Sequence, residues 1–129
     1  MRDVQLKLKF NPSGDGLSKV FLDYQEEALR FVWKKDEEGV VSREVWSHVN
    51  NNLEGKTISR ASIINFLNRM VDEGVLDFYE RTGKGGYHRV YRSKLSEAEF
   101  KKLLAKTVIF SLLRDFPKET NEVLKNLSE

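Results

Sequence analysis

Hydrophobic residues recur along the chain with two different periods, and this change of period separates the predicted strands from the predicted helices. Near the N-terminus, Val4, Leu6, Leu8 and Phe10 alternate with polar residues, which is the period of a β-strand. Turn-forming residues follow at positions 11–16. We therefore expect residues 1–20 to form a strand and loop extension on a larger domain.

Three helices are predicted in the next part of the chain. The first covers about residues 23–35, where Asp23 and Glu26 have the spacing of a capping box. The second begins at Ser42, directly after a short β-branched pair at 40–41. The third follows the N-cap residue Ser59, and its apolar residues recur at i, i+3, i+4, i+7 and i+8 without a gap.

Two extended runs come next, separated by a loop rich in glycine. They cover residues 75–81 and 87–92, and the loop between them, residues 82–86, contains three glycines. Two β-rich runs around such a loop predict a hairpin.

The C-terminal part is predicted to be helical again. Ser96 and Glu99 form a capping box at the start of a long helix, Pro117 ends it, and a shorter helix starts at about Lys118. Apolar residues are spread widely around the long helix, so more than one of its faces has to be covered.

The order helix, short strand, helix, turn, helix, hairpin is that of a winged helix-turn-helix domain. We expect a mainly α protein with a small β-hairpin wing, an α+β arrangement in which the winged domain covers residues 21–94 and helices fill residues 95–129. In this fold the third helix enters the DNA major groove and the wing touches the flanking backbone.

The third helix carries suitable polar side chains outside its apolar stripe, because asparagine pairs with adenine and arginine with guanine. Residues just before the helix could bind a phosphate at its N-terminus. An ordinary solvated helix face explains the same pattern about equally well. The candidate DNA-binding residues here are Lys56, Thr57, Ser59, Arg60, Ala61, Ser62, Asn65, Asn68 and Arg69.

The hairpin is the stronger signal, since basic residues surround a glycine-rich tip that lets the backbone approach phosphate closely. A solvated hairpin tip is the alternative. The candidate wing residues are Arg81, Lys84, His88 and Arg89.

Composition removes several other classes of function. The 129 residues contain no cysteine and only two histidines, so a cysteine-based or sequence-local histidine metal site is not expected, and no cofactor loop is found. No apolar run is long enough to span a membrane and the N-terminus is unlike a signal peptide, so we expect a cytoplasmic protein without enzymatic activity. The net charge is only +2, yet residues 56–94 hold 8 basic and 4 acidic residues.

Several segments, taken in order, resemble one known family. They are Glu27–Trp33, Ser42–Val45, Ser62–Leu76, Val90–Arg92 and Leu95–Phe100. In this order they are similar to the first helix, the second helix, the recognition helix, the end of the wing and the start of the dimerisation helix of the penicillinase-repressor (BlaI/MecI/CopY-like) winged-helix regulators.

The resemblance implies a homodimeric repressor that binds double-stranded DNA at a near-palindromic operator, with Ala61, Ser62 and Asn65 at groove-reading positions. It implies that the C-terminal helices make the dimer through Phe100, Leu103, Leu104, Val108, Ile109, Leu112, Leu113, Phe116, Leu124 and Leu127. Residues 1–16 have no counterpart in the family core, and the absence of cysteine excludes copper sensing of the CopY type. A small-molecule effector is compatible with the sequence, but no residue identifies one.

One alternative of a different class stays open at this point. A winged helix can also be a protein-interaction module in a larger assembly, with the third helix or the wing bound to another protein. The modest net charge and the presence of only two arginines on the third helix are compatible with that function.

Overall fold

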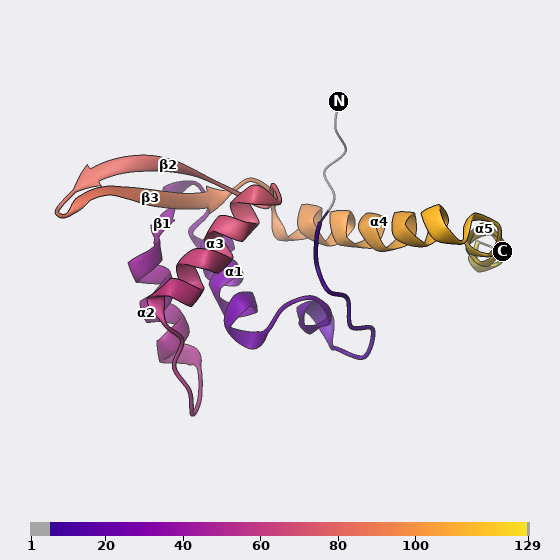
Figure 1. Cartoon of the computed structure of the whole chain (residues 1–129), viewed down its shortest axis with the longest axis horizontal. Coiled ribbons are helices and arrows are strands. Elements are labelled where there is room, and N and C mark those ends of the chain that lie inside the picture. The colour runs from indigo at the N-terminus through magenta and orange to yellow at the C-terminus, as the bar shows by residue number, and fades with distance from the viewer. Residues whose placement is uncertain (1–5, 129) are drawn as a thin grey trace.

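The computed structural model describes residues 6–128 of the chain, which fold as a helical domain with a three-stranded wing and two C-terminal helices (Figure 1). The predicted fold class is confirmed. In chain order the elements are the 3-10 turns and helices η1 (Gly16–Lys19), α1 (Asp23–Lys35) and η2 (Asp36–Glu38), then β1 (Val40–Val41), α2 (Ser42–Asn52), α3 (Arg60–Asp72), β2 (Leu76–Gly83), β3 (Gly86–Ser93), α4 (Glu97–Asp115) and α5 (Pro117–Leu127).

The three strands form an antiparallel sheet in the order β1-β3-β2. Its central strand places Tyr91 opposite Val40 on one side and opposite Phe78 on the other. The turn between β2 and β3 contains only Lys84 and Gly85, so the predicted five-residue loop was too long. Positive φ angles of 88° at Gly85 and 107° at Gly86 allow this tight connection.

The core lies where α1, α2 and α3 meet the inner face of the sheet. Each helix contributes one apolar stripe, as the sequence predicted, and both tryptophans pack at its edge with the indole N–H bonded to a backbone carbonyl. The fully buried side chains include Leu29, Val32, Val40, Val45, Val49, Ile63, Leu67, Met70, Val75 and Phe100.

In two helices the N-cap residue lies one position earlier than the sequence predicted. Leu22, not Asp23, is the N-cap of α1, because its backbone N–H donates to the side chain of Gln25 at 2.9 Å. In the same way Val41, not Ser42, is the N-cap of α2, and its N–H donates to Glu44 at 3.3 Å. In both cases the side chain three residues on satisfies the free backbone donor.

The prediction of a strand near the N-terminus was wrong for the residues that the structure describes. Residues 6–10 form no strand pairing, and Val4 lies outside the described part. The alternation instead reflects a loop on the surface, in which Leu6 and Leu8 face the protein while Lys7 and Lys9 face solvent. Apolar residues that recur with a period of two show that one side of an extended segment is buried. They do not show that the segment belongs to a sheet.

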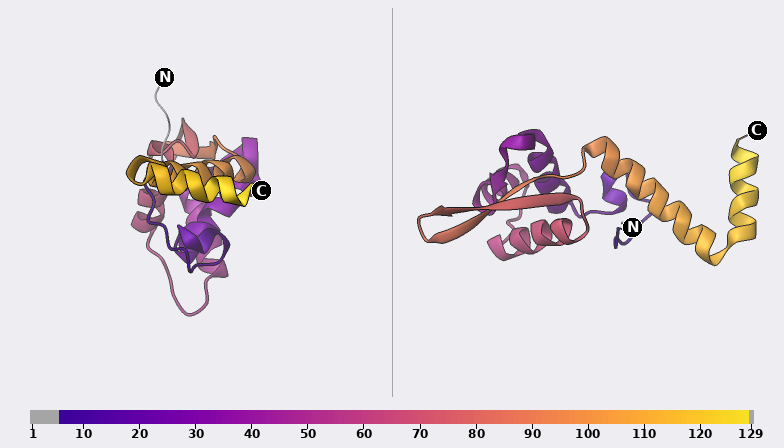
Figure 2. Two further views of the ribbon diagram at one scale, coloured as in Figure 1. Left: turned by 90° about the vertical axis from the view of Figure 1, so that its right-hand side faces the viewer. Right: turned by 90° about the horizontal axis from the view of Figure 1, so that it is seen from above.

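The two C-terminal helices extend away from the domain (Figure 2). The capping box of Ser96 and Glu99 opens α4 as predicted, with the Glu99 N–H donating to Ser96 Oγ at 3.1 Å. Pro117 is the first residue of α5, one position before the predicted start, which suits a residue without an N–H. Figure 2 shows α5 turning sharply from the end of α4.

Phe100 was predicted at the dimer interface, and this placement is corrected by its burial within the chain. The ring is completely buried, stacks on Phe21 at 5.5 Å between centroids and lies 5.8 Å from the Trp33 ring. Leu103 and Leu104, one turn further along α4, are partly buried against the same core. Helical periodicity cannot distinguish a residue covered by its own chain from one covered by a partner.

We predict that Phe100→Ala lowers the free energy of unfolding by about 3–5 kcal/mol, the range for removing a large aromatic side chain from a core. Chemical denaturation at a fixed protein concentration measures this. Tyr87→Ala is the control, because the Tyr87 ring is 77% exposed in the wing and lies outside the predicted dimer interface, so its removal should cost much less. Equal losses for both variants would place Phe100 outside the core.

Candidate nucleic-acid interface

The local sequence determines which face of α3 is exposed. Ser59 caps the helix, since its Oγ accepts the Ser62 N–H at 3.1 Å as predicted. Ile63, Phe66, Leu67 and Met70 are buried, so the opposite face has to point outward. That face presents Arg60, Ala61 and Asn65, which are exposed, with Ser62 partly exposed beside them.

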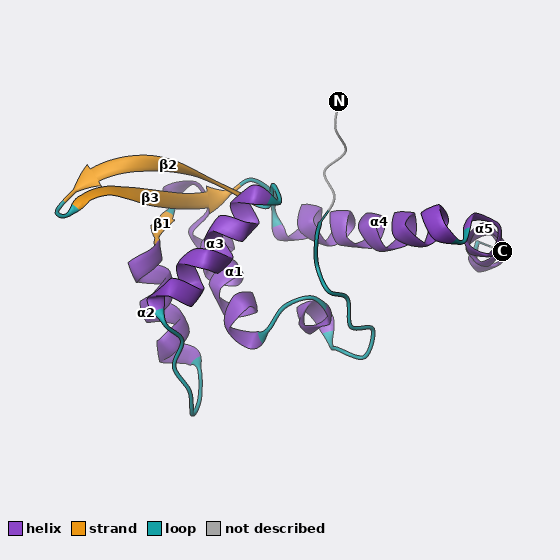
Figure 3. Ribbon diagram, viewed as in Figure 1, coloured by secondary structure: helices purple, strands orange, loops and turns teal. Residues whose placement is uncertain are grey.

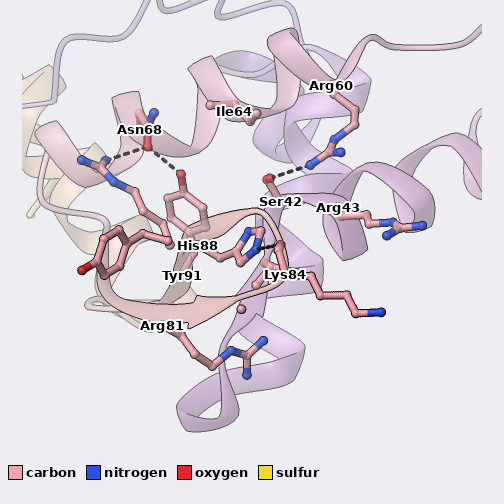
Figure 4. A pocket seen from close by; sticks show the side chains of 13 residues that line it. Ser42, Arg43, Arg60, Ile64, Asn68, Arg81, Lys84, His88 and Tyr91 are labelled. Carbon is pink, nitrogen blue, oxygen red and sulfur yellow. Dashed lines mark hydrogen bonds between the residues drawn. The ribbon is translucent and has the colours of Figure 1, made fainter.

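A hollow of about 700 Å³ lies between the start of α2, the outer face of α3 and the wing (Figure 4). Arg43, Arg60, Arg81, Lys84 and Arg89 line it, and none of the described residues around it is acidic. The Arg60 guanidinium is within 3.4 Å of Ser42 Oγ, to which it donates, while the Lys84 side chain points outward from the wing tip. This arrangement can bind an anion such as a phosphate group.

Ser42 and Arg43 are among the residues of this hollow that sequence reasoning missed. Both lie in the first turn of α2, where free backbone N–H groups favour negatively charged ligands. A signal for them was present in the sequence. A basic residue beside the predicted N-cap of a helix that precedes the recognition helix is a candidate for phosphate contact.

Two predicted DNA-binding residues instead hold the wing against α3. Asn68 Oδ1 accepts hydrogen bonds from Arg89 Nη1 at 3.0 Å and from the Tyr91 hydroxyl at 2.6 Å (Figure 4). The Arg89 guanidinium also lies 3.9 Å from the centre of the Phe78 ring. Burial raises the pKa of the Tyr91 hydroxyl, so it keeps the proton that it donates. We call Asn68, Arg89 and Tyr91 the wing clamp.

Other predicted residues also have partners within the chain. Arg69 Nε lies 3.4 Å from Glu73, and its guanidinium lies over the Phe66 ring. Lys56 pairs with Asp23 of α1, which lowers the pKa of that carboxyl. His88 Nε2 is 3.0 Å from the Lys84 carbonyl oxygen and stabilises the wing tip. Thr57 is exposed in the loop before α3.

The described residues offer no sign of a metal or membrane function. No group of three potential metal-ligating side chains occurs within residues 6–128. No helix in that range is long and apolar enough to cross a membrane. The polar groups that line the hollow are guanidinium, ammonium, imidazole, amide and hydroxyl groups.

The profile of the penicillinase-repressor family matches residues 23–129 of the chain. The chain belongs to this family. Penicillinase repressors are transcriptional regulators without enzymatic activity, and membership implies DNA binding. The match begins at the first residue of α1, so the N-terminal extension of this penicillinase-repressor protein lies before it.

Two solved structures are similar to the chain, and the first supports the same fold. A protein of Thermoplasma acidophilum, TA0346, proposed to be a transcriptional regulator, is 18% identical, with 78% of this chain and 90% of that chain covered and a TM-score of 0.50. A PadR-family transcription regulator from hypervirulent Clostridium difficile R20291 is 17% identical, with 78% and 98% covered and a TM-score of 0.46. No curated protein matches the chain.

We predict that Asn68→Ala lowers the free energy of unfolding by about 1–3 kcal/mol, because it leaves the Tyr91 hydroxyl without its acceptor. Thermal or chemical unfolding measures this. Asn65→Ala is the matched control on the exposed face of the same helix and should change stability by no more than about 0.5 kcal/mol. If the two variants were equally stable, the wing clamp would have no structural role.

Proposed function

We propose that this protein is a homodimeric repressor that binds a near-palindromic operator, with α3 in the major groove and the wing on the flanking backbone. The observation that carries this proposal is the hollow without acidic residues between α3 and the wing. Arginine and lysine side chains from α2, α3 and the wing lie together there, on the exposed side of the predicted recognition helix. A major groove is about 12 Å wide and admits one helix.

Base reading is assigned to the exposed face of α3. Asn65 is one turn beyond Ala61 and fully on the outer face, where its amide can pair with the N6 and N7 edge of adenine. Arg60 can donate to guanine from the start of the helix. Ala61 and Ser62 offer few polar groups, so DNA shape contributes part of the specificity.

Phosphate binding is assigned to the residues around the hollow. Arg43 in the first turn of α2 and Lys84 at the wing tip line the same hollow beside α3, which suits contacts to the DNA backbone next to the groove. Arg81, which is also on the wing, adds a third positive charge to this set. Asn68, Arg89 and Arg69 are left out of this set because other side chains of the chain already bind them.

Dimerisation is assigned to the helices that extend from the domain. Along α4 and α5, apolar side chains stay in contact with solvent, including Phe110 at 45%, Leu112 at 43% and Leu127 at 77% exposed. Large apolar side chains exposed along both helices indicate an interface. A second copy of the chain would cover these side chains and place two α3 helices side by side, as a near-palindromic operator requires.

We predict that two substitutions in the proposed DNA interface have different effects on DNA binding. Asn65→Ala should remove the preference for a DNA selected from a random library by the unsubstituted protein, while keeping its binding to random DNA. Lys84→Ala should weaken both DNAs by the same factor and reduce the slope of log affinity against log salt by about one.

Fluorescence anisotropy at several salt concentrations measures both effects. Lys34→Ala, which removes the same charge at the end of α1, is the control and should leave both affinities unchanged. Loss of all binding in the Asn65→Ala variant while it remains folded, or an unchanged preference, would contradict the base-reading assignment.

We predict that Leu112→Asp converts the dimer to a monomer, because it puts a charge into the apolar surface of α4. Multi-angle light scattering measures the change in mass. Ala98→Asp is the control, since it adds the same charge to the first turn of the same helix, where an acidic residue is tolerated. A monomeric unsubstituted protein would contradict the proposed dimer itself.

A further inference from the structure

The segment before α1 is built into the fold although it precedes the family match. Leu6 retains 6%, Leu17 3% and Phe21 5% of their surface exposed, so all three belong to the core. Within the segment, the Asn11 N–H donates to the Lys19 carbonyl at 2.7 Å, which closes the loop between them. These residues therefore form a defined structure on this chain.

One side of this segment lies on α4. Leu6, Leu8 and Phe10 share a groove of about 540 Å³ with residues 107–114 of that helix, including Val108 and Phe110. Figure 3 shows the N-terminal loop passing α4. The hydrophobic residues of α4 that pack against the core reach only as far as Leu104, and the groove shared with residues 6–10 lies beyond that point.

The same segment is bonded to the end of α3. The Lys7 backbone N–H donates to Glu73 Oε1 at 2.8 Å, and Glu73 is the residue that follows the last turn of the recognition helix. Its side chain is almost completely buried, with the second oxygen facing Arg69. A charge-assisted hydrogen bond in a partly buried site is among the stronger single contacts available to a loop.

The length of α4 makes its angle important. Its 19 residues span about 28 Å at 1.5 Å per residue. A rotation of about 10° at its base would move the far end by about 5 Å, more than the rise of about 3.4 Å between successive base pairs. Without support beyond Leu104, small changes in this angle would alter where two DNA-binding domains sit relative to each other.

We propose that residues 6–10 are a strap that fixes the angle of α4 relative to α3, and so sets the separation of the two recognition helices and the half-site spacing that the protein accepts. The strap rests on the proposed dimer. Residues 6–10 would then influence which operator the protein binds, although they lie outside the DNA interface.

The absence of cysteine allows a direct test of the strap. Ser47→Cys, at an exposed position of α2, gives each protomer one spin label, and pulsed electron paramagnetic resonance then measures the distance between the two labels of a dimer. We expect a narrow distance distribution in this background. Adding Leu6→Ser or Phe10→Ser should widen it about twofold, because α4 then pivots at its base.

Leu22→Ser is the matched control. It is the same chemical change as Leu6→Ser, but Leu22 lies outside the strap, directly before α1, and is 62% exposed, so the distribution should stay narrow. Phe10 is 45% exposed and lies outside the buried core, so its variant reports on the strap even if Leu6→Ser fails to fold.

The outcomes separate the strap from the proposed dimer. An unchanged distribution in a folded Phe10→Ser dimer overturns the strap, as does equal broadening in Leu22→Ser. If the protein without the strap substitutions is a monomer, no distance between labels is measured, and this result overturns the proposed function instead. In the supported case, DNA carrying one base pair more or fewer between half-sites should lose less affinity with Phe10→Ser than with the unsubstituted protein.

Discussion

Three aromatic rings join the parts of this protein that would otherwise be separate. Phe21 of the N-terminal extension packs edge-on against Phe66 of α3 at 5.6 Å and stacks on Phe100 of α4 at 5.5 Å. The helix predicted to read DNA and the helix predicted to build the dimer thus share one core. Because protein interiors are close-packed, a shift of either helix must be accommodated by the other.

This shared core determines which faces of α3 and the wing remain exposed for binding a partner. One face of α3 is used up in the core, so the opposite face and the wing are what remains for a partner. The wing clamp then holds β3 against α3 by means of Asn68, which fixes the hollow between them. The elements that carry the basic residues of this hollow are thus fixed relative to one another before binding, which reduces the entropy lost when a partner binds.

Much of the fold could be predicted from the sequence because local signals were strong. The first helix ends at Lys35 and the third is capped by Ser59, as their apolar stripes and polar caps indicated. The extension could not be predicted correctly, because its alternating pattern shows only that one side is covered. Phe100 was misplaced for a similar reason, since an apolar position does not reveal which surface covers it.

The candidate site could be predicted in part. The exposure of Asn65 and Lys84 follows from helix and turn periodicity, which are local properties. The wing clamp depends on residues 21 and 23 positions apart in the sequence, and no local pattern shows that Asn68 accepts both hydrogen bonds. The role of Arg43 likewise depends on how α2 sits beside α3 and the wing.

The central claim is that α3 reads DNA sequence as one half of a dimer. The most direct measurement is selection of bound DNA from a random library, followed by titration of the enriched and random sequences at two salt concentrations. The account predicts an inverted repeat whose half-site centres are about 34 Å apart, bound about 10³-fold or more tightly than random DNA and weakened sharply by salt. No enrichment, or equal affinity for enriched and random DNA, would contradict it.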